Sequence, residues 1–210
     1  MSVAITGGIG SGKSFVCRLL AERGIEIYDC DAAAKRLMRN SAELRQQLSE
    51  LIGSHTYFPD GRLNKAAVAA FLLQSDDHAQ AINDIVHPAV ARDFIESGYQ
   101  WMECAILYES GFDRLVDRVI AVTAPDDVRI RRIVERDGIT PEEARQWINR
   151  QWPQQKTAML ADLLIVNDGI QPLLPQIDRI IYTSDMTEKS VSPQKPNKKK
   201  YERDHLSHLR

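Results

Sequence analysis

The sequence predicts an α/β fold in which a parallel five-stranded sheet lies between two layers of helices. Short apolar segments alternate with stretches of helical periodicity, and the first of them leads directly into a glycine-rich turn and a helix. Several of these segments are continuously apolar, as expected of parallel strands covered on both faces. The predicted strands are Val3–Thr6, Glu26–Tyr28, Trp101–Leu107, Val116–Val122 and Leu163–Val166.

The turn after the first strand is a phosphate-binding loop. Residues 7–14 read Gly-Gly-Ile-Gly-Ser-Gly-Lys-Ser, which fits the pattern G-x-x-x-x-G-K-[ST] between a strand and a helix that ends near Gly24. Glycines let the backbone curl so that successive N–H groups point at a phosphate, and the start of the helix adds partial positive charge. Lys13 is expected to reach the outer phosphates, and the Ser14 hydroxyl to bind Mg²⁺. The loop predicts a protein that binds a nucleoside triphosphate.

Between residues 31 and 98 the strand signal disappears and helical patterns replace it. The predicted helices are Ala32–Arg39, Glu43–Ile52, Lys65–Leu73 and a final stretch that contains Ile82 and Val90. His87-Pro88 is expected to start a new helix or to kink one, because proline is tolerated mainly at the start of a helix.

Three parts follow from this pattern. Residues 1–30 and 99–182 are predicted to form a nucleotide-binding core, and residues 31–98 a helical insert that binds the acceptor. Residues 183–210 are low in apolar residues and are predicted to be a disordered tail.

Two arginine-rich helices are predicted after the fourth strand. The first begins at Pro125 and places Arg129, Arg132 and Arg136 mostly opposite its apolar side. The second begins with a capping box at residues 140–143, with proline in the first helical position, and is expected to carry Trp152. Together they predict a movable lid over about residues 133–158. The last strand ends in a turn at Asn167-Asp168-Gly169, and a final helix follows.

Carboxylates at the ends of strands are the candidates for catalysis. Asp29 and Asp31 follow the second strand, and ligands gather at the carboxyl ends of strands in open α/β sheets. A kinase needs an acidic group that orients the attacking hydroxyl and takes its proton. The alternative is an aspartate that caps the next helix, and we assign capping mainly to Asp29 and chemistry to Asp31. Glu109 either orients a magnesium-bound water or the substrate, or caps the helix that follows.

Two arginines and one histidine are further candidates. Arg132 and Arg136 are one helical turn apart and therefore lie on one face. Phosphoryl transfer spreads negative charge over the moving group, which arginines can clamp, and arginines can also stack on adenine. Surface solvation is the alternative for either one. His87 is more typical of a helix cap or a packed histidine than of a catalyst, and its lone position supports no metal site.

Composition and charge exclude several classes of protein. The chain of 210 residues has 43% hydrophobic and 27% charged residues, which is typical of a globular protein, and it has no apolar stretch long enough to cross a bilayer. The N-terminus runs straight into a strand without the regions of a signal peptide. The body outside the basic tail is acidic, which argues against nucleic acid as the partner. Three cysteines without metal or disulfide spacing complete a pattern that predicts a cytoplasmic location.

Together these motifs resemble those of the dephospho-coenzyme A kinase family. The resemblance runs from Ser2 to about Ile181 and is carried by residues 6–14, 29–31, 60–63, 87–88, 132, 136, 161–162 and 167–169. It implies a P-loop kinase fold with a helical substrate-binding insert and a lid. It also implies transfer of the γ-phosphate of ATP, with Mg²⁺, to the ribose 3′-hydroxyl of dephospho-coenzyme A.

The resemblance implies roles for individual residues. Asp31 matches the catalytic aspartate that binds the ribose hydroxyl, Arg136 matches a lid arginine, and Asn167 lies where the family contacts adenine. The nucleotide site then consists of Gly8, Ile9, Gly10, Ser11, Gly12, Lys13, Ser14, Phe15 and Asn167, with Ser14 as the metal ligand. The catalytic set is Lys13, Asp31, Arg132 and Arg136, and the acceptor set is Asp31, Lys65, His87 and Glu109.

The chain departs from the family pattern at three places. Phe15 replaces the usual threonine, Lys65 stands where arginine is common, and residues 106–108 read Ile-Leu-Tyr in place of Pro-Leu-Leu. None of these changes removes a group that the reaction requires.

Two alternatives share the loop. Another small-molecule kinase, for nucleosides, nucleotides or sugars, would share the loop and the aspartate but differ in the insert. A nucleotide-dependent switch protein is disfavoured because residues 167–169 do not supply the Asn-Lys-x-Asp motif that reads a guanine base. The partner is expected to be a small-molecule substrate, with no nucleic acid or membrane, and the protein to be a monomer or weak oligomer.

Overall fold

The computed structural model of the chain describes the backbone of residues 1–190 and the side chains of residues 1–183. The described residues form two compact units. The first consists of Met1–Tyr28 together with the residues from Tyr99 onward, and the second of Asp29–Gly98.

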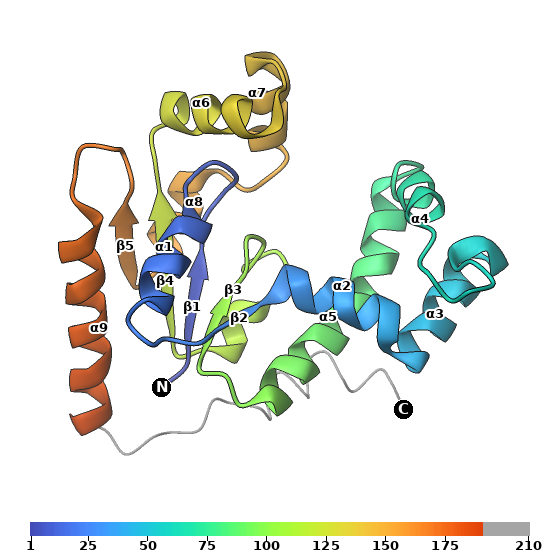
Figure 1. The fold of residues 1–210 in the computed structure, drawn as a ribbon, viewed down its shortest axis with the longest axis horizontal. Coiled ribbons are helices and arrows are strands. Elements are labelled where there is room, and N and C mark those ends of the chain that lie inside the picture. Colours follow the sequence, from blue (N-terminus) through green and yellow to red (C-terminus); the bar gives the residue numbers. More distant parts are fainter. Residues whose placement is uncertain (191–210) are drawn as a thin grey trace. The chain divides into compact units, whose positions relative to one another are not determined.

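A five-stranded parallel sheet forms the centre of the first unit (Figure 1). Its strands are β1 (Val3–Thr6), β2 (Ile27–Asp29), β3 (Trp101–Glu103), β4 (Arg118–Thr123) and β5 (Leu163–Val166), in the order β2-β3-β1-β4-β5. Val3 lies opposite both Trp101 and Arg118, and Ile120 lies opposite Leu163. The predicted α/β fold with a parallel sheet is confirmed, since β1 has a strand on each side and all four of its residues are buried.

One predicted strand is longer than the observed one. The apolar run from Trp101 suggested a strand up to Leu107, but β3 ends at Glu103. The Cys104 N–H still donates to the Ile5 carbonyl, and the chain then turns so that Leu107 is buried away from the strand. An apolar run shows that residues are buried, but it does not show where pairing with the neighbouring strand ends.

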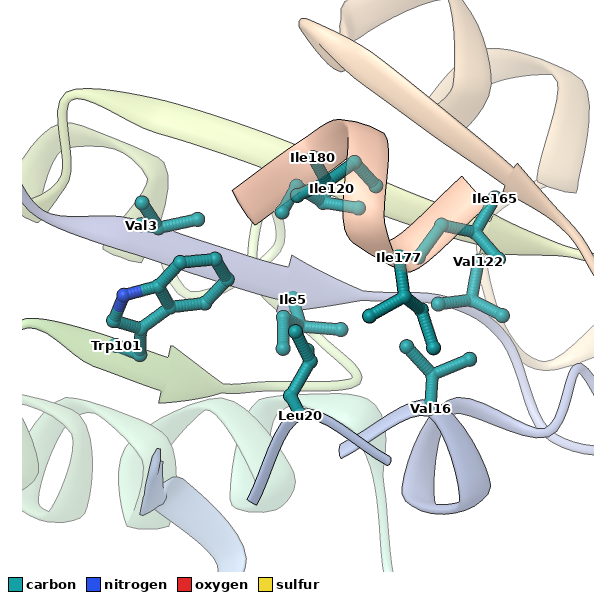
Figure 2. Packing of buried hydrophobic residues seen from close by; sticks show 10 residues of the cluster. All are labelled: Val3, Ile5, Val16, Leu20, Trp101, Ile120, Val122, Ile165, Ile177 and Ile180. Atoms are coloured by element: carbon teal, nitrogen blue, oxygen red, sulfur yellow. The ribbon is translucent and has the colours of Figure 1, made fainter. Parts of the chain in front are cut away.

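Two helices bury one face of the sheet. Helix α1 (Lys13–Ala21) contributes Val16 and Leu20, and helix α9 (Leu173–Ser190) contributes Ile177 and Ile180. Figure 2 shows these side chains together with residues from the strands, namely Val3, Ile5, Trp101, Ile120, Val122 and Ile165. The strand residues alternate along β1 and β4, so they point to the same face of the sheet.

The remaining helices of the first unit are α6 (Asp126–Asp137), α7 (Pro141–Asn149) and α8 (Gln154–Leu160), with a short 3₁₀ helix at Phe112–Leu115. The capping box at the start of α7 is confirmed, because Thr140 and Glu143 exchange both capping bonds. The prediction that this helix carries Trp152 is wrong. A residue that precedes proline is disfavoured in helical conformation, so α7 ends before Pro153 and α8 starts after it.

The second unit is helical. It contains α2 (Cys30–Asn40), α3 (Ala42–Ile52), a 3₁₀ helix at Ser54–Thr56, α4 (Lys65–Leu72) and α5 (Asp76–Ser97). Helix α5 runs through Pro88, so the expectation that His87-Pro88 starts a new helix is wrong. Pro88 has no N–H to donate to the carbonyl of Asp84, and the helix continues without that bond.

The C-terminal helix reaches into the segment expected to be a tail. Helix α9 ends at Ser190, so the first residues of the predicted tail are helical rather than disordered. The rest of that prediction, for residues 191–210, lies outside the described residues. Among the helices that the structure describes, none has the length and hydropathy of a membrane span.

Candidate nucleotide-binding site

The loop between β1 and α1 needs glycine where it approaches helix α6 and Asn167. Gly10 has φ 79°, and a Cβ there would lie 2.7 Å from the carbonyl oxygen of Arg129. Gly12 has φ 86°, and a Cβ there would collide with the side-chain nitrogen of Asn167. Gly12 is also the N-terminal cap of α1, and no side chain caps that helix. The loop therefore packs closely against Arg129 and Asn167, and no side chain caps the N-terminus of α1.

Arg129 supports the loop from inside the protein. Only 3% of its surface is exposed, its Nε donates to the carbonyl of Ile9 at 3.0 Å, and its Nη1 donates to Asp126 at 3.0 Å. The prediction that Arg129 lies with Arg132 and Arg136 opposite the apolar side of the helix does not account for this burial. One signal was available, because Arg129 lies one helical turn before Ile133, which is buried in the apolar side of α6.

Arg132 and Asn167 bind the loop and each other. The Arg132 Nη1 lies 3.4 Å from the Gly10 carbonyl oxygen and 3.3 Å from that of Ser11, and its Nη2 donates to Asn167 at 3.2 Å. The Asn167 amide donates to the Ser11 carbonyl at 2.9 Å. Asn167 directly follows β5, and its own backbone N–H donates to Thr123 at the end of β4. Helix α6 thus holds the loop through Arg132, and the carboxyl ends of β4 and β5 hold it through Asn167.

Arg136 differs from Arg132 although both project from α6. Its guanidinium binds the carboxylate of the neighbouring Asp137 through Nε and Nη2, at 2.7 to 3.1 Å. This bond raises the pKa of Arg136 and lowers the pKa of Asp137. Of the two arginines expected to act together, the described structure brings Arg132 to the loop and pairs Arg136 with Asp137.

Lys13 forms an ion pair with Glu103. Glu103 is the last residue of β3 and lies opposite Ile5 in the parallel register, so the pairing of the two strands carries its carboxylate to the loop. Both side chains are largely buried, with 12% and 16% exposed. Sequence analysis missed Glu103. The available signal was an acidic residue inside an otherwise apolar predicted strand.

The segment between α7 and α8 meets the loop and the chain after β3. The Ile9 N–H donates to the side-chain oxygen of Gln151 at 2.7 Å. The Trp152 N–H lies 3.5 Å from Glu109, and the rings of Trp152 and Tyr108 are parallel at 6.1 Å between centroids. Burial raises the pKa of Tyr108 to about 12, so its hydroxyl is neutral at physiological pH. Gln151 was not among the residues that the sequence singled out.

Glu109 does not cap the helix that follows it. The cap of the 3₁₀ helix at Phe112–Leu115 is Gly111, whose φ of 72° is left-handed. Glu109 is exposed, and its carboxylate lies 3.5 Å from the backbone nitrogen of Trp152. The capping alternative for Glu109 is therefore wrong.

In the second unit, Asp29 at the end of β2 and Asp31 in the first turn of α2 make different contacts. The Asp29 carboxylate accepts from the Ala32 N–H at 2.8 Å and caps α2. Asp31 lies in the first turn of α2 and is exposed. Both carboxylates are exposed, and the assignment of capping to Asp29 is confirmed.

Lys65 and His87 occupy different kinds of position. Lys65 is the exposed first residue of α4. His87 lies inside α5 and is half-buried, so the helix-cap alternative for it is wrong. Burial lowers the pKa of His87, and the nearby Asp84 carboxylate opposes that shift. The imidazole is therefore neutral at physiological pH.

The oxygen donors around the loop are of the kind that Mg²⁺ prefers. They are the hydroxyl of Ser14, at the start of α1, and the carboxylate of Glu103 beside Lys13. No group of three or more His, Cys, Asp or Glu side chains that could hold a metal ion occurs in the described part of the chain. Mg²⁺ commonly binds through one or two protein oxygens together with substrate phosphates and water, which this donor set fits.

Comparison with known proteins identifies the family. The family model described as dephospho-CoA kinase matches residues 1–172. This chain belongs to the dephospho-CoA kinase family. A dephospho-CoA kinase of Porphyromonas gingivalis is 42% identical over 190 residues, which cover 87% of this chain and 94% of that protein. One of Bacteroides fragilis is 38% identical over 192 residues, which cover 86% of this chain and 91% of the relative.

Solved structures share the fold. The crystal structure of TT1252 from Thermus thermophilus has a TM-score of 0.74 and 27% identity, and covers 89% of this chain and 97% of its own. The dephospho-CoA kinase of Campylobacter jejuni has a TM-score of 0.62 and 16% identity, over 90% of this chain and 98% of its own, and supports the fold alone. As a member of the family, the chain is a phosphotransferase with dephospho-CoA kinase activity, the last step of coenzyme A biosynthesis.

Proposed function

We propose that the enzyme transfers the γ-phosphoryl group of ATP to the ribose 3′-hydroxyl of dephospho-coenzyme A, with the triphosphate in the loop of residues 7–14 and Asp31 as the general base. The observation that carries the proposal is the loop itself. Its carbonyl groups face Arg129, Arg132 and Asn167, and it leads into a helix whose start no side chain caps.

The proposed nucleotide site uses the backbone first. Arg129, Arg132 and Asn167 bind loop carbonyls, and the positive end of the α1 dipole and N–H groups of the loop are proposed to bind the phosphates. Lys13 adds a full positive charge to the site when its ammonium group contacts phosphate as well as Glu103. The contacting residues are Gly8, Ile9, Gly10, Ser11, Gly12, Lys13, Ser14 and Phe15, and Asn167 is the proposed contact to adenine.

Ser14 is the proposed ligand of Mg²⁺, and Glu103 is a second candidate. The ion, when bound, neutralises charge on the β- and γ-phosphates. Ser14 and Glu103 would supply oxygen ligands to the ion, and Lys13 would stay beside the phosphates.

Asp31 supplies the acid–base chemistry in this proposal. As the 3′-oxygen forms its bond to the γ-phosphorus, the bond to the β–γ bridging oxygen breaks, ADP leaves, and the hydroxyl proton passes to the Asp31 carboxylate. Two observations support this role. Asp31 comes two residues after the end of β2, and the capping of α2 is done by Asp29, so the Asp31 carboxylate is not used for that purpose.

Arg132 and Arg136 are proposed to stabilise the charge that develops on the transferred group. Arg136 belongs to a proposed lid of about residues 133–158, and Arg132 directly precedes it. Arg132 is already beside the loop, whereas Arg136 would first have to exchange Asp137 for phosphate. A guanidinium aimed at a developing charge stabilises the transition state more than the ground state.

The acceptor is proposed to bind through Asp31, Lys65 and His87, which belong to the proposed insert of residues 31–98. Glu109, from the proposed core of residues 1–30 and 99–182, completes the acceptor set. Lys65 offers an exposed cation to a phosphate of the acceptor. A neutral His87 can donate and accept hydrogen bonds but carries no charge. Glu109 can accept hydrogen bonds from hydroxyl groups. The expected cytoplasmic location and the expected monomer or weak oligomer stay predictions.

A panel of acceptors tests the proposal. The enzyme is incubated with ATP, Mg²⁺ and either dephospho-coenzyme A, nucleosides, nucleotides or sugars, and ADP release is followed while the product is located by phosphorus NMR. We expect ADP release that depends on dephospho-coenzyme A and a product phosphorylated at the 3′-hydroxyl. Faster turnover of a nucleoside or sugar would support the other small-molecule kinase, and ATP hydrolysis independent of any acceptor would contradict the proposal.

A further inference from the structure

Side chains from outside the loop hold both polar backbone groups of Ile9. The Ile9 carbonyl accepts from Arg129 Nε at 3.0 Å, and the Ile9 N–H donates to Gln151 Oε1 at 2.7 Å. The same two side chains flank the preceding residue, because a Cβ at Gly8 would lie 2.6 Å from Arg129 Nη2 and 3.2 Å from Gln151 Oε1. Ile9 is thus fixed from two directions.

The two bonds have different consequences for phosphate binding. A carbonyl oxygen repels an anion, so the bond from Arg129 removes an unfavourable group and is compatible with a phosphate in the loop. An N–H group of a phosphate-binding loop is a donor to phosphate oxygen. Gln151 Oε1 is therefore a neutral acceptor on a group that a phosphate oxygen would also use.

Gln151 is held where it is by its neighbours. Its own N–H donates to the Ile148 carbonyl at 3.2 Å, just after the end of α7. The next residue, Trp152, approaches Glu109 through its N–H at 3.5 Å and lies parallel to Tyr108. A change in the contact between Gln151 and Ile9 therefore acts on the short connection between α7 and α8.

We propose that the side-chain oxygen of Gln151 and a nucleotide phosphate compete for the Ile9 N–H. Phosphate binding then releases the connection between α7 and α8 from the loop. Gln151 is a positioning residue in this proposal, because it acts through the loop backbone. The proposal rests on the proposed function, because it requires the nucleotide phosphates to lie in the loop. The contact of Gln151 with the Ile9 N–H is then present without nucleotide and absent when phosphate is bound.

Three substitutions of Gln151 test the competition by isothermal titration with Mg²⁺ and a non-hydrolysable ATP analogue. Gln151→Met keeps the length but removes the amide oxygen, and Gln151→Asn keeps the amide but shortens its reach. Both are expected to lower the Kd of the analogue about fivefold, the value of one neutral hydrogen bond. Gln151→Glu is expected to raise the Kd at least about tenfold, because a carboxylate is a stronger acceptor and repels phosphate.

Gln155 gives the matched control, since it is exposed on α8. Gln155→Met and Gln155→Glu repeat the chemical changes close by and should leave the Kd unchanged. The Kd of dephospho-coenzyme A should be unaffected by every Gln151 substitution, which separates competition at the loop from a general loss of structure.

The results that overturn the proposal are an unchanged or raised Kd in Gln151→Met or Gln151→Asn, or an unchanged Kd in Gln151→Glu. If the unsubstituted enzyme phosphorylates dephospho-coenzyme A normally, these results reject the role of Gln151 alone. If that enzyme gives no acceptor-dependent transfer at all, the proposed function fails instead.

Discussion

The helix that follows the phosphate-binding loop begins differently from the helices of residues 29–98. In the second unit, the side chains of Asp29, Ser41, Asn64 and Ser75 cap α2, α3, α4 and α5. Helix α1 starts at Gly12 without a side-chain cap and has no acidic residue in its first turn. A cap stabilises a helix by occupying its first N–H groups, and an acid there would repel an anion. The start of α1 has neither a side-chain cap nor an acidic residue in its first turn, which is compatible with the proposed binding of phosphate there.

The contrast between Asp29 and Asp31 gives the test with the largest expected effect. Asp31→Asn should lower the rate of phosphoryl transfer by a factor of about 10² to 10⁴, the scale of a lost general base, with the Kd of ATP retained. Asp29→Asn is the matched control, since asparagine caps a helix as well as aspartate does. Turnover at saturating substrates and nucleotide titration provide the readouts. Near-normal turnover in Asp31→Asn would assign the acid–base role to another carboxylate.

A comparison of alanine substitutions at Gly12 and Gly24 distinguishes the cost of backbone strain from the cost of disturbing the packing of the loop. Their φ angles are 86° and 80°, but a Cβ at Gly12 meets Asn167, whereas nothing lies within 4 Å of one at Gly24. Gly24→Ala should lower the free energy of unfolding by about 1 kcal/mol, the cost of left-handed backbone. Gly12→Ala should cost at least about 2 kcal/mol, because Asn167 must also move. Urea denaturation measures both, and equal losses would show that Asn167 yields easily.

Removing a cap should affect stability and leave the nucleotide site alone. Asp29→Ala deletes the acceptor of the Ala32 N–H, and it should lower the free energy of unfolding by about 1 kcal/mol. The Kd of ATP should stay within about twofold, since the bond lies within α2 and its cap. Thermal unfolding of Asp29→Ala and Asp29→Asn side by side checks this, with the asparagine variant expected to match the unsubstituted enzyme. A large change in ATP affinity would contradict the separation of the two kinds of helix start.

The smallest expected effect is a dependence of stability on pH. Burial lowers the pKa of His87 below its usual 6.5, so the unfolded chain binds this proton at a higher pH than the folded chain does. Stability from the neutral form is therefore fully present above pH 6.5 and is lost as the pH falls toward the folded pKa. Comparison of unfolding at pH 7.5 and pH 5.5 should show a smaller acid loss, by less than about 1 kcal/mol, in His87→Gln. An identical loss in both proteins would place the effect at another group.

Much of the fold and part of the site could be predicted from local patterns. The loop motif, the capping box at Thr140 and the capping of α2 by Asp29 depend on neighbours a few residues apart, and short-range geometry decides them. The end of β3 at Glu103, the bond from Arg129 to Ile9 and the contact of Gln151 with Ile9 depend on segments that are far apart in the sequence. Nothing within a few residues of them specifies those partners.

The sequence by itself determined that a strand, a phosphate-binding loop and a helix follow one another, because backbone conformation and capping are local properties of glycines, apolar runs and small polar side chains. Only the tertiary structure decided which charges and amides hold that loop. Parallel pairing brings Glu103 to Lys13, and packing of α6 under the loop buries Arg129. Such contacts arise when the chain folds on itself, since burial then makes each polar group find whichever partner lies within reach.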